Sequence, residues 1–200
     1  GISVCYEANE AFYIPVGHKE RTELKKDVVL KKLKPILEDP SIKKVGQNIK
    51  YDYIIFRNNG IELSSVEDTM LLSYILDAGN NRHNMDTLSE LHLGHKTISY
   101  KDLVGTGKKQ LNFADVDIKP ATEYAAEDAD ITLRLYEVLS ERVSEEKLEK
   151  VYEVFEKPMI KILSRLEMNG IKVDDAYLKK LSKKFEERLK AIEKEIYKIS

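Results

Sequence analysis

The order of short strands and longer helices along these 200 residues predicts an α/β fold. Short alternating apolar runs open the chain and indicate a β-hairpin, and apolar residues at helical spacing recur after it. The hydrophobic fraction of 42% is ordinary for a globular protein. No apolar run reaches the roughly 18 residues that a membrane span requires. We therefore expect a packed core and no membrane partner.

Cysteine content and charge restrict the cellular setting and the partners. Cys5 is the only cysteine, so no disulfide can form within the chain, which fits a cytoplasmic protein. A net charge of −2 lacks the strongly basic surface of a tight duplex binder. This charge is compatible with an enzyme that holds the end of one nucleic-acid strand through metal ions. Because the chain has no signal peptide and no starting Met, we expect a fragment of a longer protein.

The first elements are a hairpin and a helix. Apolar residues on both sides of a polar turn at residues 7–10 predict a hairpin over residues 2–16. Five apolar positions at helical spacing then predict a helix over residues 27–38, which Pro40 ends.

The next elements are a short strand and three helices. Residues 43–46 are the strand, and a helix over residues 48–59 follows it, with Gly60 as its C-terminal cap. Asp68 is the expected N-cap of a second helix. A capping box at residues 87–90 predicts the start of a third.

The last part of the chain is mostly helical. Residues 99–120 are polar and contain glycine, which indicates a partly ordered loop, and a strong helix is expected over residues 121–142. A long charged helix then reaches about residue 168, and Asp174 or Asp175 caps a final helix.

Two pairs of polar residues carry the chemistry. Asn48 and Asp52 are four residues apart, so they share one face of their predicted helix. Tyr124 and Asp128 have the same spacing, and the alanines between them leave room for a ligand. Hard oxygen ligands suit Mg²⁺, and two such ions can activate water and stabilise the leaving oxygen in phosphodiester hydrolysis. Each aspartate could equally be a helix cap or a solvated charge, and spacing alone does not separate these interpretations.

Several segments together resemble one family. Residues 45–52 (VGQNIKYD) and 124–130 (YAAEDAD) resemble the second and third motifs of DEDD exonucleases of the tyrosine subclass. The closest resemblance is to the 3′→5′ proofreading exonuclease domain of bacterial DNA polymerase I, a family A polymerase. Further matching segments are residues 12–16 (FYIPV), 68–70 (DTM), 82–86 (RHNMD), 110–113 (QLNF) and 165–174 (RLEMNGIKVD).

The resemblance implies roles for individual residues. Asp52 and Asp128 would bind two catalytic ions, Mg²⁺ or Mn²⁺, and Tyr124 would position the attacking water. A further set would lie near a single-stranded DNA 3′ end: Gln47, Asn48, Lys50, Tyr51 and Arg82. Phe113 could stack on a base, since every base offers a π face, or it could belong to the core.

The resemblance also implies a fold and a domain organisation. The fold would be a ribonuclease H-like mixed sheet flanked by helices, with strand order 3-2-1-4-5. The hairpin would supply strands two and three, and residues 43–46 strand four, so the first strand is missing. The exonuclease domain would cover residues 1–143. Residues 144–200 would be a helical extension that begins the polymerase domain, which is the expected partner within the parent chain.

One departure limits the expected activity. The family's first motif, an Asp-x-Glu on the first strand, does not occur in the hairpin, and the polymerase motifs do not occur either. We therefore expect the proofreading module of a bacterial, nucleoid-associated enzyme. In the form of this truncated chain, we expect the module to be inactive. The expected sheet would compensate in one of three ways: the hairpin pairs directly with strand four, another segment or another chain fills the gap, or upstream residues do so. Two alternative functions are an inert DNA-binding or scaffold domain and an RNA-trimming exonuclease similar to ribonuclease D.

Overall fold

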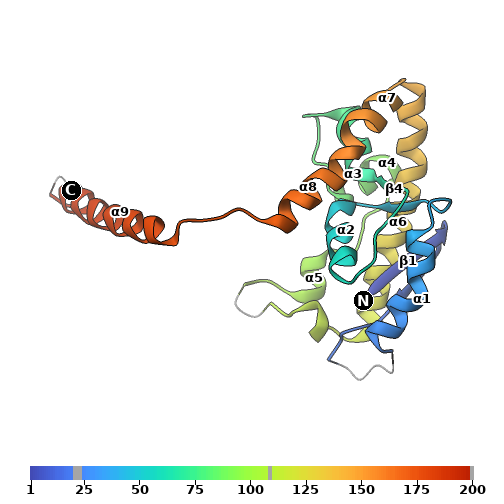
Figure 1. Ribbon diagram of the computed structural model, residues 1–200, viewed down its shortest axis with the longest axis horizontal. Coiled ribbons are helices and arrows are strands. Elements are labelled where there is room, and N and C mark those ends of the chain that lie inside the picture. The colour runs from blue at the N-terminus through green and yellow to red at the C-terminus, as the bar shows by residue number, and fades with distance from the viewer. Residues whose placement is uncertain (20–23, 108–109, 199–200) are drawn as a thin grey trace. The chain divides into compact units, whose positions relative to one another are not determined.

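The computed structural model describes residues 1–19, 24–107 and 110–198. The chain divides into two compact units, Gly1–Arg165 and Leu166–Ser200. The first unit contains all the strands of the described residues and the residues singled out for catalysis (Figure 1). The predicted boundary between the exonuclease and polymerase regions, after residue 143, stays a prediction.

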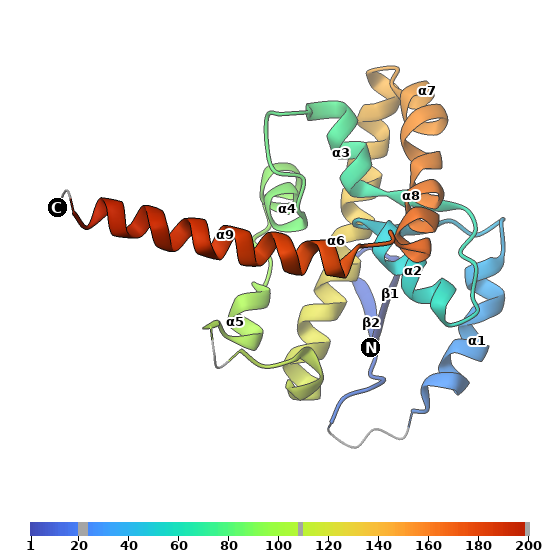
Figure 2. The ribbon, with the colours of Figure 1, turned by 60° about the vertical axis from the view of Figure 1, so that its left-hand side comes forward.

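The predicted hairpin is present. Strands β1 (Ile2–Glu7) and β2 (Glu10–Ile14) pair antiparallel, with Ile2 opposite Ile14. Asn9 occupies the turn with a φ of 68°, a left-handed conformation that Asn tolerates better than most residues. The hairpin lies against the long helix α6 (Ile118–Glu145), as both views of the ribbon show (Figures 1 and 2).

A second pair of strands forms its own sheet. Strand β3 (Lys44–Gly46) pairs in parallel with β4 (Val66–Asp68), so that Lys44 faces Val66 and Gly46 faces Asp68. Helix α2 (Ile49–Asn58) lies between these strands in the sequence, as a parallel pair requires a crossover. Within the described residues, the hairpin does not pair with β3. Direct pairing of the hairpin with the expected fourth strand, one of the three arrangements considered above, is therefore not found.

The remaining helices of the first unit surround these strands. They are α1 (Lys26–Glu38), α3 (Thr69–Asp77), α4 (Met85–Leu93), α5 (Tyr100–Val104), the 3₁₀ turn η2 (Phe113–Asp115), α7 (Glu149–Val151), the π-helical turn η3 (Tyr152–Glu156) and α8 (Lys157–Asn169). The second unit contains the end of α8 and helix α9 (Asp175–Ile196). None of the helices in the described ranges is long and apolar enough to cross a membrane.

Local capping signals were correct in two places and wrong in one. Asp68 caps α3 by accepting from the Met70 N–H at 2.9 Å, and Asp174 caps α9 by accepting from the Tyr177 N–H at 2.9 Å. The expected capping box at residues 87–90 is wrong, because α4 begins at Met85 and the box lies inside the helix.

The region expected to be a loop, residues 99–120, is more ordered than predicted. It contains α5 and η2. Ser99 caps α5 by accepting from the Lys101 N–H at 3.3 Å, a local signal that the glycines and polar residues around it obscured. Helix α6 also begins earlier than expected, because Pro120 is compatible with the first turn of a helix.

The core of the first unit is built around α6. Leu88, Ile131, Leu135 and Leu139 are fully buried and pack with Tyr152 in one cluster. A second cluster joins α2, β4 and α8 through Ile49, Tyr53, Leu63, Val66 and Ile160. Because α8 contributes to this second cluster, the helical segment that follows α6 is part of the packed unit.

Candidate active site

The start of α2 is fixed by three unusual features of the segment that precedes it. A Cβ on Gly46 would lie 2.8 Å from a side-chain carbon of Ile49, so this position requires glycine. Asn48 has a φ of 56° and a ψ of 48°, a left-handed conformation. The Asp68 carboxylate accepts from the Asn48 N–H and from the Ile49 N–H, each at 3.0 Å. The segment therefore begins the helix at one defined residue, which sets the direction of Asp52 one turn later.

Asp52 is open to solvent but closely surrounded by protein. Desolvation, with a smaller contribution from the nearby Asp68 carboxylate, raises the pKa of Asp52 to about 6. The Asp52 side chain is exposed to solvent, although many protein atoms lie near it. Water that reaches the carboxylate screens part of the effect. This is the environment of an acid that an incoming cation can reach.

Asp128 and Tyr124 form the second half of the candidate site. The Tyr124 hydroxyl donates a hydrogen bond to the Asp128 carboxylate. The Oδ1 atom of Asp128 is buried and has no hydrogen-bond partner in the described part of the chain. Desolvation, opposed by the Tyr124 hydrogen bond and assisted by the Glu127 and Asp86 charges, raises the pKa of Asp128 to about 7. A buried oxygen without a donor is costly unless a ligand completes it.

The pKa of Tyr124 is raised, first by desolvation and then by the Asp128 charge. Its hydroxyl therefore stays protonated near neutral pH, so it acts as a hydrogen-bond donor and not as a base. An aromatic group surrounds its ring: Tyr100 and Phe113 lie 5.8 and 6.1 Å from it between ring centroids. Tyr100 and Phe113 also stack on each other at 6.3 Å.

Phe113 belongs to this aromatic group and is partly buried. It contacts Tyr13 and His18 as well as the two tyrosines near the site. Tyr100, by contrast, is 42% exposed. Tyr100 was not singled out from the sequence, because it lies in the stretch expected to be a loop. Its stacking on Phe113 depends on a contact between distant segments.

A series of side-chain contacts connects the start of α2 with α6. The side-chain NH₂ group of Gln47 donates to the His83 backbone carbonyl at 2.7 Å. The side-chain oxygen of Gln47 accepts from the Thr69 hydroxyl at 2.5 Å. Two residues beyond His83, the Met85 sulfur lies 3.5 Å from the hydroxyl oxygen of Thr132, and this hydroxyl donates to the Asp128 backbone carbonyl at 2.7 Å. The loop before α4 thus joins the segments that carry Asp52 and Asp128. The convergence of the two carboxylates within about 8 Å, as a shared two-ion site demands, stays a prediction.

The other predicted DNA-binding residues are placed as follows. Asn48, Tyr51 and Arg82 are exposed, and Lys50 is half-buried. Gln47 is half-buried, and the two hydrogen bonds described above engage its amide. Their contact with a DNA strand stays a prediction.

The fit of these residues to a metal ion is partial. No group of three or more His, Cys, Asp or Glu side chains is arranged as a cation site among residues 1–19, 24–107 and 110–198. The unpartnered buried oxygen of Asp128 and the accessible carboxylate of Asp52 are nevertheless the type of donor that Mg²⁺ and Mn²⁺ prefer. The assignment of Asp52 and Asp128 to a two-ion site stays a prediction.

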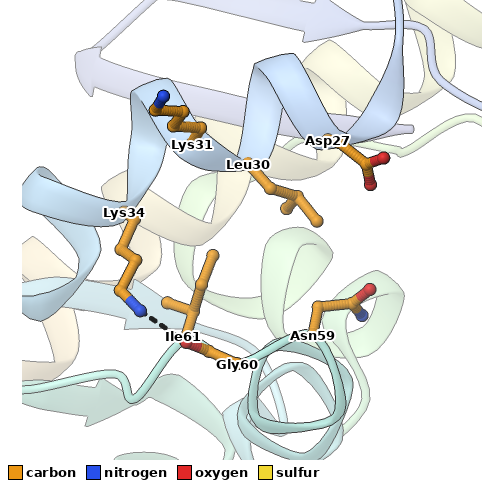
Figure 3. Close-up of a pocket in the computed structure, with 7 residues that line it drawn as sticks. All are labelled: Asp27, Leu30, Lys31, Lys34, Asn59, Gly60 and Ile61. Carbon is orange, nitrogen blue, oxygen red and sulfur yellow. Dashed lines mark hydrogen bonds between the residues drawn. The ribbon is translucent and has the colours of Figure 1, made fainter.

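A shallow pocket of about 290 Å³ lies elsewhere, between α1 and the end of α2. Leu30 and Lys34 face Gly60 and Ile61 across it, and Lys34 donates to the Gly60 carbonyl at 2.7 Å (Figure 3). None of the candidate catalytic residues lines this pocket, so it is separate from the site at the opposite end of α2.

Comparisons with known proteins show which family this chain resembles. A family model described as 3′–5′ exonuclease matches residues 1–144. DNA polymerase I of Rhizobium leguminosarum is 46% identical over an alignment of 198 residues that covers 94% of this chain and 20% of that polymerase. DNA polymerase I of Pseudomonas aeruginosa is 41% identical over 207 residues and matches 100% of this chain and 23% of the polymerase.

Solved structures show the same fold. The polymerase domain of Pol1 from M. smegmatis, in complex with DNA primer-template and dNTP, matches 84% of this chain and 26% of that chain with a TM-score of 0.63 at 20% identity. NrnC of Brucella melitensis matches 80% of this chain and 72% of its own with a TM-score of 0.58 at 22% identity.

The fold and the family match together define a nuclease domain of the ribonuclease H-like α/β class. The chain belongs to the family of 3′–5′ exonuclease domains found in DNA polymerase I. It spans about a fifth of the length of the first polymerases it matches.

Proposed function

We propose that this chain is the proofreading module of a DNA polymerase I and hydrolyses the terminal phosphodiester at a single-stranded DNA 3′ end. The observation that carries this proposal is the Tyr124–Asp128 pair, in which a protonated hydroxyl lies beside a carboxylate with an unpartnered buried oxygen. The polymerase domain of the same parent chain would be its partner, in a cytoplasmic, nucleoid-associated enzyme.

Asp52 and Asp128 would hold divalent ions, Mg²⁺ or Mn²⁺, together with carboxylates beyond these two. Such ions supply charge stabilisation and a more acidic water when bound. The Tyr124 hydroxyl would orient the nucleophilic water by a hydrogen bond, and the exposed Asn48 at the start of α2 would contact the strand.

The aromatic group beside Tyr124 suits a sequence-independent substrate. Stacking contributes roughly 1–3 kcal/mol per base and discriminates little between bases, as removal of any mispaired nucleotide demands. Phe113 and the exposed Tyr100 would supply the stacking face, and the approach of the strand would be lined by Gln47, Lys50, Tyr51 and Arg82.

The decisive test is Tyr124→Phe in the parent polymerase, assayed on a labelled single-stranded DNA. We expect kcat to fall about 10- to 100-fold while KM changes little, because the hydroxyl acts on the water and not on the strand. Tyr136→Phe is the matched control: Tyr136 lies on the same helix and its hydroxyl accepts from Lys43 at 2.9 Å. An unchanged kcat for Tyr124→Phe would remove this residue from the mechanism.

Equal rates on an RNA strand would favour the RNA-trimming alternative, and no hydrolysis by the parent enzyme would favour an inert scaffold.

Metal binding by the 200-residue chain itself is a second test. Two carboxylates give Mg²⁺ or Mn²⁺ little advantage over full hydration, so we expect an affinity for Mn²⁺ of about millimolar or weaker by calorimetry. Asp128→Asn should abolish what binding there is, and Glu123→Gln, at an exposed position on the same helix, should not. A micromolar site lost in Asp128→Asn would instead reveal further ligands within these residues.

A further inference from the structure

The helical segment after α6 makes a direct polar contact with the strand next to the candidate site. Tyr152, the first residue of the π-helical turn η3, is 3% exposed. Its hydroxyl accepts from the backbone N–H of Asp68 at 2.9 Å and donates to the Glu67 carboxylate. One hydroxyl thus connects with two consecutive residues of β4. Single π turns of this kind are frequent at functional sites.

The same turn is held at β4 by an ion pair. Glu67 is 5% exposed, and Lys157, at the start of α8, donates to its carboxylate at 2.7 Å. The Lys157 ammonium also lies 5.6 Å from the centre of the Tyr152 ring. Because a buried carboxylate requires its partner, Glu67 and Lys157 fix the position of this turn relative to β4.

Asp68 carries this connection onward to the candidate site. It is 1% exposed, and its carboxylate accepts from the Asn48, Ile49 and Met70 N–H groups at 2.9–3.0 Å. The first two belong to the left-handed turn that begins α2. A displacement of the Asp68 backbone would therefore move the hydrogen bonds that hold this turn, and with it the direction of Asp52.

We propose that Tyr152 and Asp68 are positioning residues, which transmit the placement of the segment after α6 to the α2 turn that carries Asn48 and Asp52. The segment leads out of the exonuclease region, so its placement would adjust how well the site is assembled. The inference rests on the proposed function for its effect on hydrolysis, but the connection itself is independent of any activity.

Tyr152→Phe isolates the hydroxyl, because it keeps the ring in the core and leaves the Asp68 charge in place. Tyr136→Phe is a closely matched control. Tyr136 packs against the same core cluster, its hydroxyl also accepts one hydrogen bond, and a lysine ammonium lies 5.5 Å from its ring. Its partner, Lys43, is exposed and acts on Glu67 and Lys157 through its charge, which Tyr136→Phe leaves unchanged.

The first measurement is amide hydrogen exchange of the 200-residue chain by NMR. In Tyr152→Phe we expect exchange at Asn48 and Ile49 to accelerate at least about 10-fold, as local opening of their hydrogen bonds becomes easier. The control should leave both amides unchanged. A lower unfolding temperature for Tyr152→Phe without any change at these two amides would mean a purely structural role and would overturn the proposal.

The second measurement is hydrolysis of single-stranded DNA by the parent polymerase. Tyr152→Phe should lower kcat about 10-fold with KM within about twofold, because small displacements of a catalytic group impair chemistry more than binding. Asp68→Asn, which loses the acceptor for the Ile49 N–H, should show the same split more strongly. Faster exchange with unchanged kcat would overturn the positioning role. Asp128→Ala distinguishes failure of the proposed function from failure of this inference. If the proposed function fails, Asp128→Ala retains the wild-type rate of hydrolysis, whatever the effect of Tyr152→Phe.

Discussion

Asp128 is held where the protein favours its protonated form. Its folded-state pKa of about 7 lies above the ordinary value of 3.8, and desolvation is the main cause. Between these two values the folded chain binds more protons than the unfolded chain. Stability contributed by this group is therefore greatest at low pH and is lost as the pH rises through about 7.

Asp128→Asn should accordingly gain stability relative to the wild type as the pH rises. We expect the variant to be more stable by about 1–3 kcal/mol at pH 8, because the amide has no charge to desolvate, and the difference to shrink toward pH 4. Urea unfolding at the two pH values measures this. Glu123→Gln, at an exposed position on the same helix, is the control. Its difference in stability from the wild type should change by no more than about 0.5 kcal/mol between the two pH values. A pH-independent difference for Asp128→Asn would contradict the raised pKa.

At the residue scale, the sequence indicates Asp52, Tyr124 and Asp128, because four-residue spacing and motif resemblance are both local properties. Asp68 is predicted only as a helix cap, and that part is confirmed. Its second role, accepting from the Asn48 and Ile49 N–H groups, depends on parallel pairing of β3 with β4 and is not visible in sequence spacing.

At the element scale, α8 is attached to β4 by one buried ion pair as well as by the apolar packing of Ile160 with Val66. Lys157→Met removes the cation beside the Glu67 carboxylate, which is 5% exposed and keeps the hydrogen bond from the Tyr152 hydroxyl. We expect a loss of about 3–5 kcal/mol in the free energy of unfolding, measured with urea near neutral pH.

Arg57→Met provides the control for this loss. Arg57 pairs with Glu62 in the same unit, but both side chains are nearly half exposed, so its loss should cost no more than about 1 kcal/mol. The double variant Glu67→Gln with Lys157→Met should recover much of the stability, since it no longer buries an unpaired charge. Similar losses for Lys157→Met and Arg57→Met would mean that the buried pair has no special weight.

Elements with strong local patterns are those the sequence predicts. The hairpin, α1, α2 and the break after α8 follow from alternation, helical spacing and glycine. Strand β4 is missed because it has three residues, of which only Val66 is apolar, and its burial comes from distant neighbours. Helix α5 is missed because five residues are too few to show a period.

At the scale of the whole molecule, β1 and β2 pair as strands two and three were expected to, and in the described residues their sheet remains separate from that of β3 and β4. Helix α6 contacts the hairpin and β3, so it is the element common to both sheets. Sequence periodicity predicts α6 but not this role, because the role follows from which elements it contacts.

The distribution of buried side chains leads to a prediction about the two units. Every buried residue among those described lies at or before Ser164, and α9 has none. A chain ended at Gly170 should therefore unfold within about 2 °C of the full chain, since less than about 1 kcal/mol is removed from the first unit. A chain ended at Leu148 loses Tyr152, Lys157 and Ile160, which contact the two larger core clusters and Glu67, and should unfold at least about 10 °C lower or fail to fold. Thermal unfolding followed by tyrosine absorbance compares the three chains.

In the full chain, the α9 amides should exchange far faster than those of α6, because a helix without buried contacts is marginal in water. Equal losses in the two shortened chains, or slow exchange in α9, would show that the second unit contributes to the stability of the first.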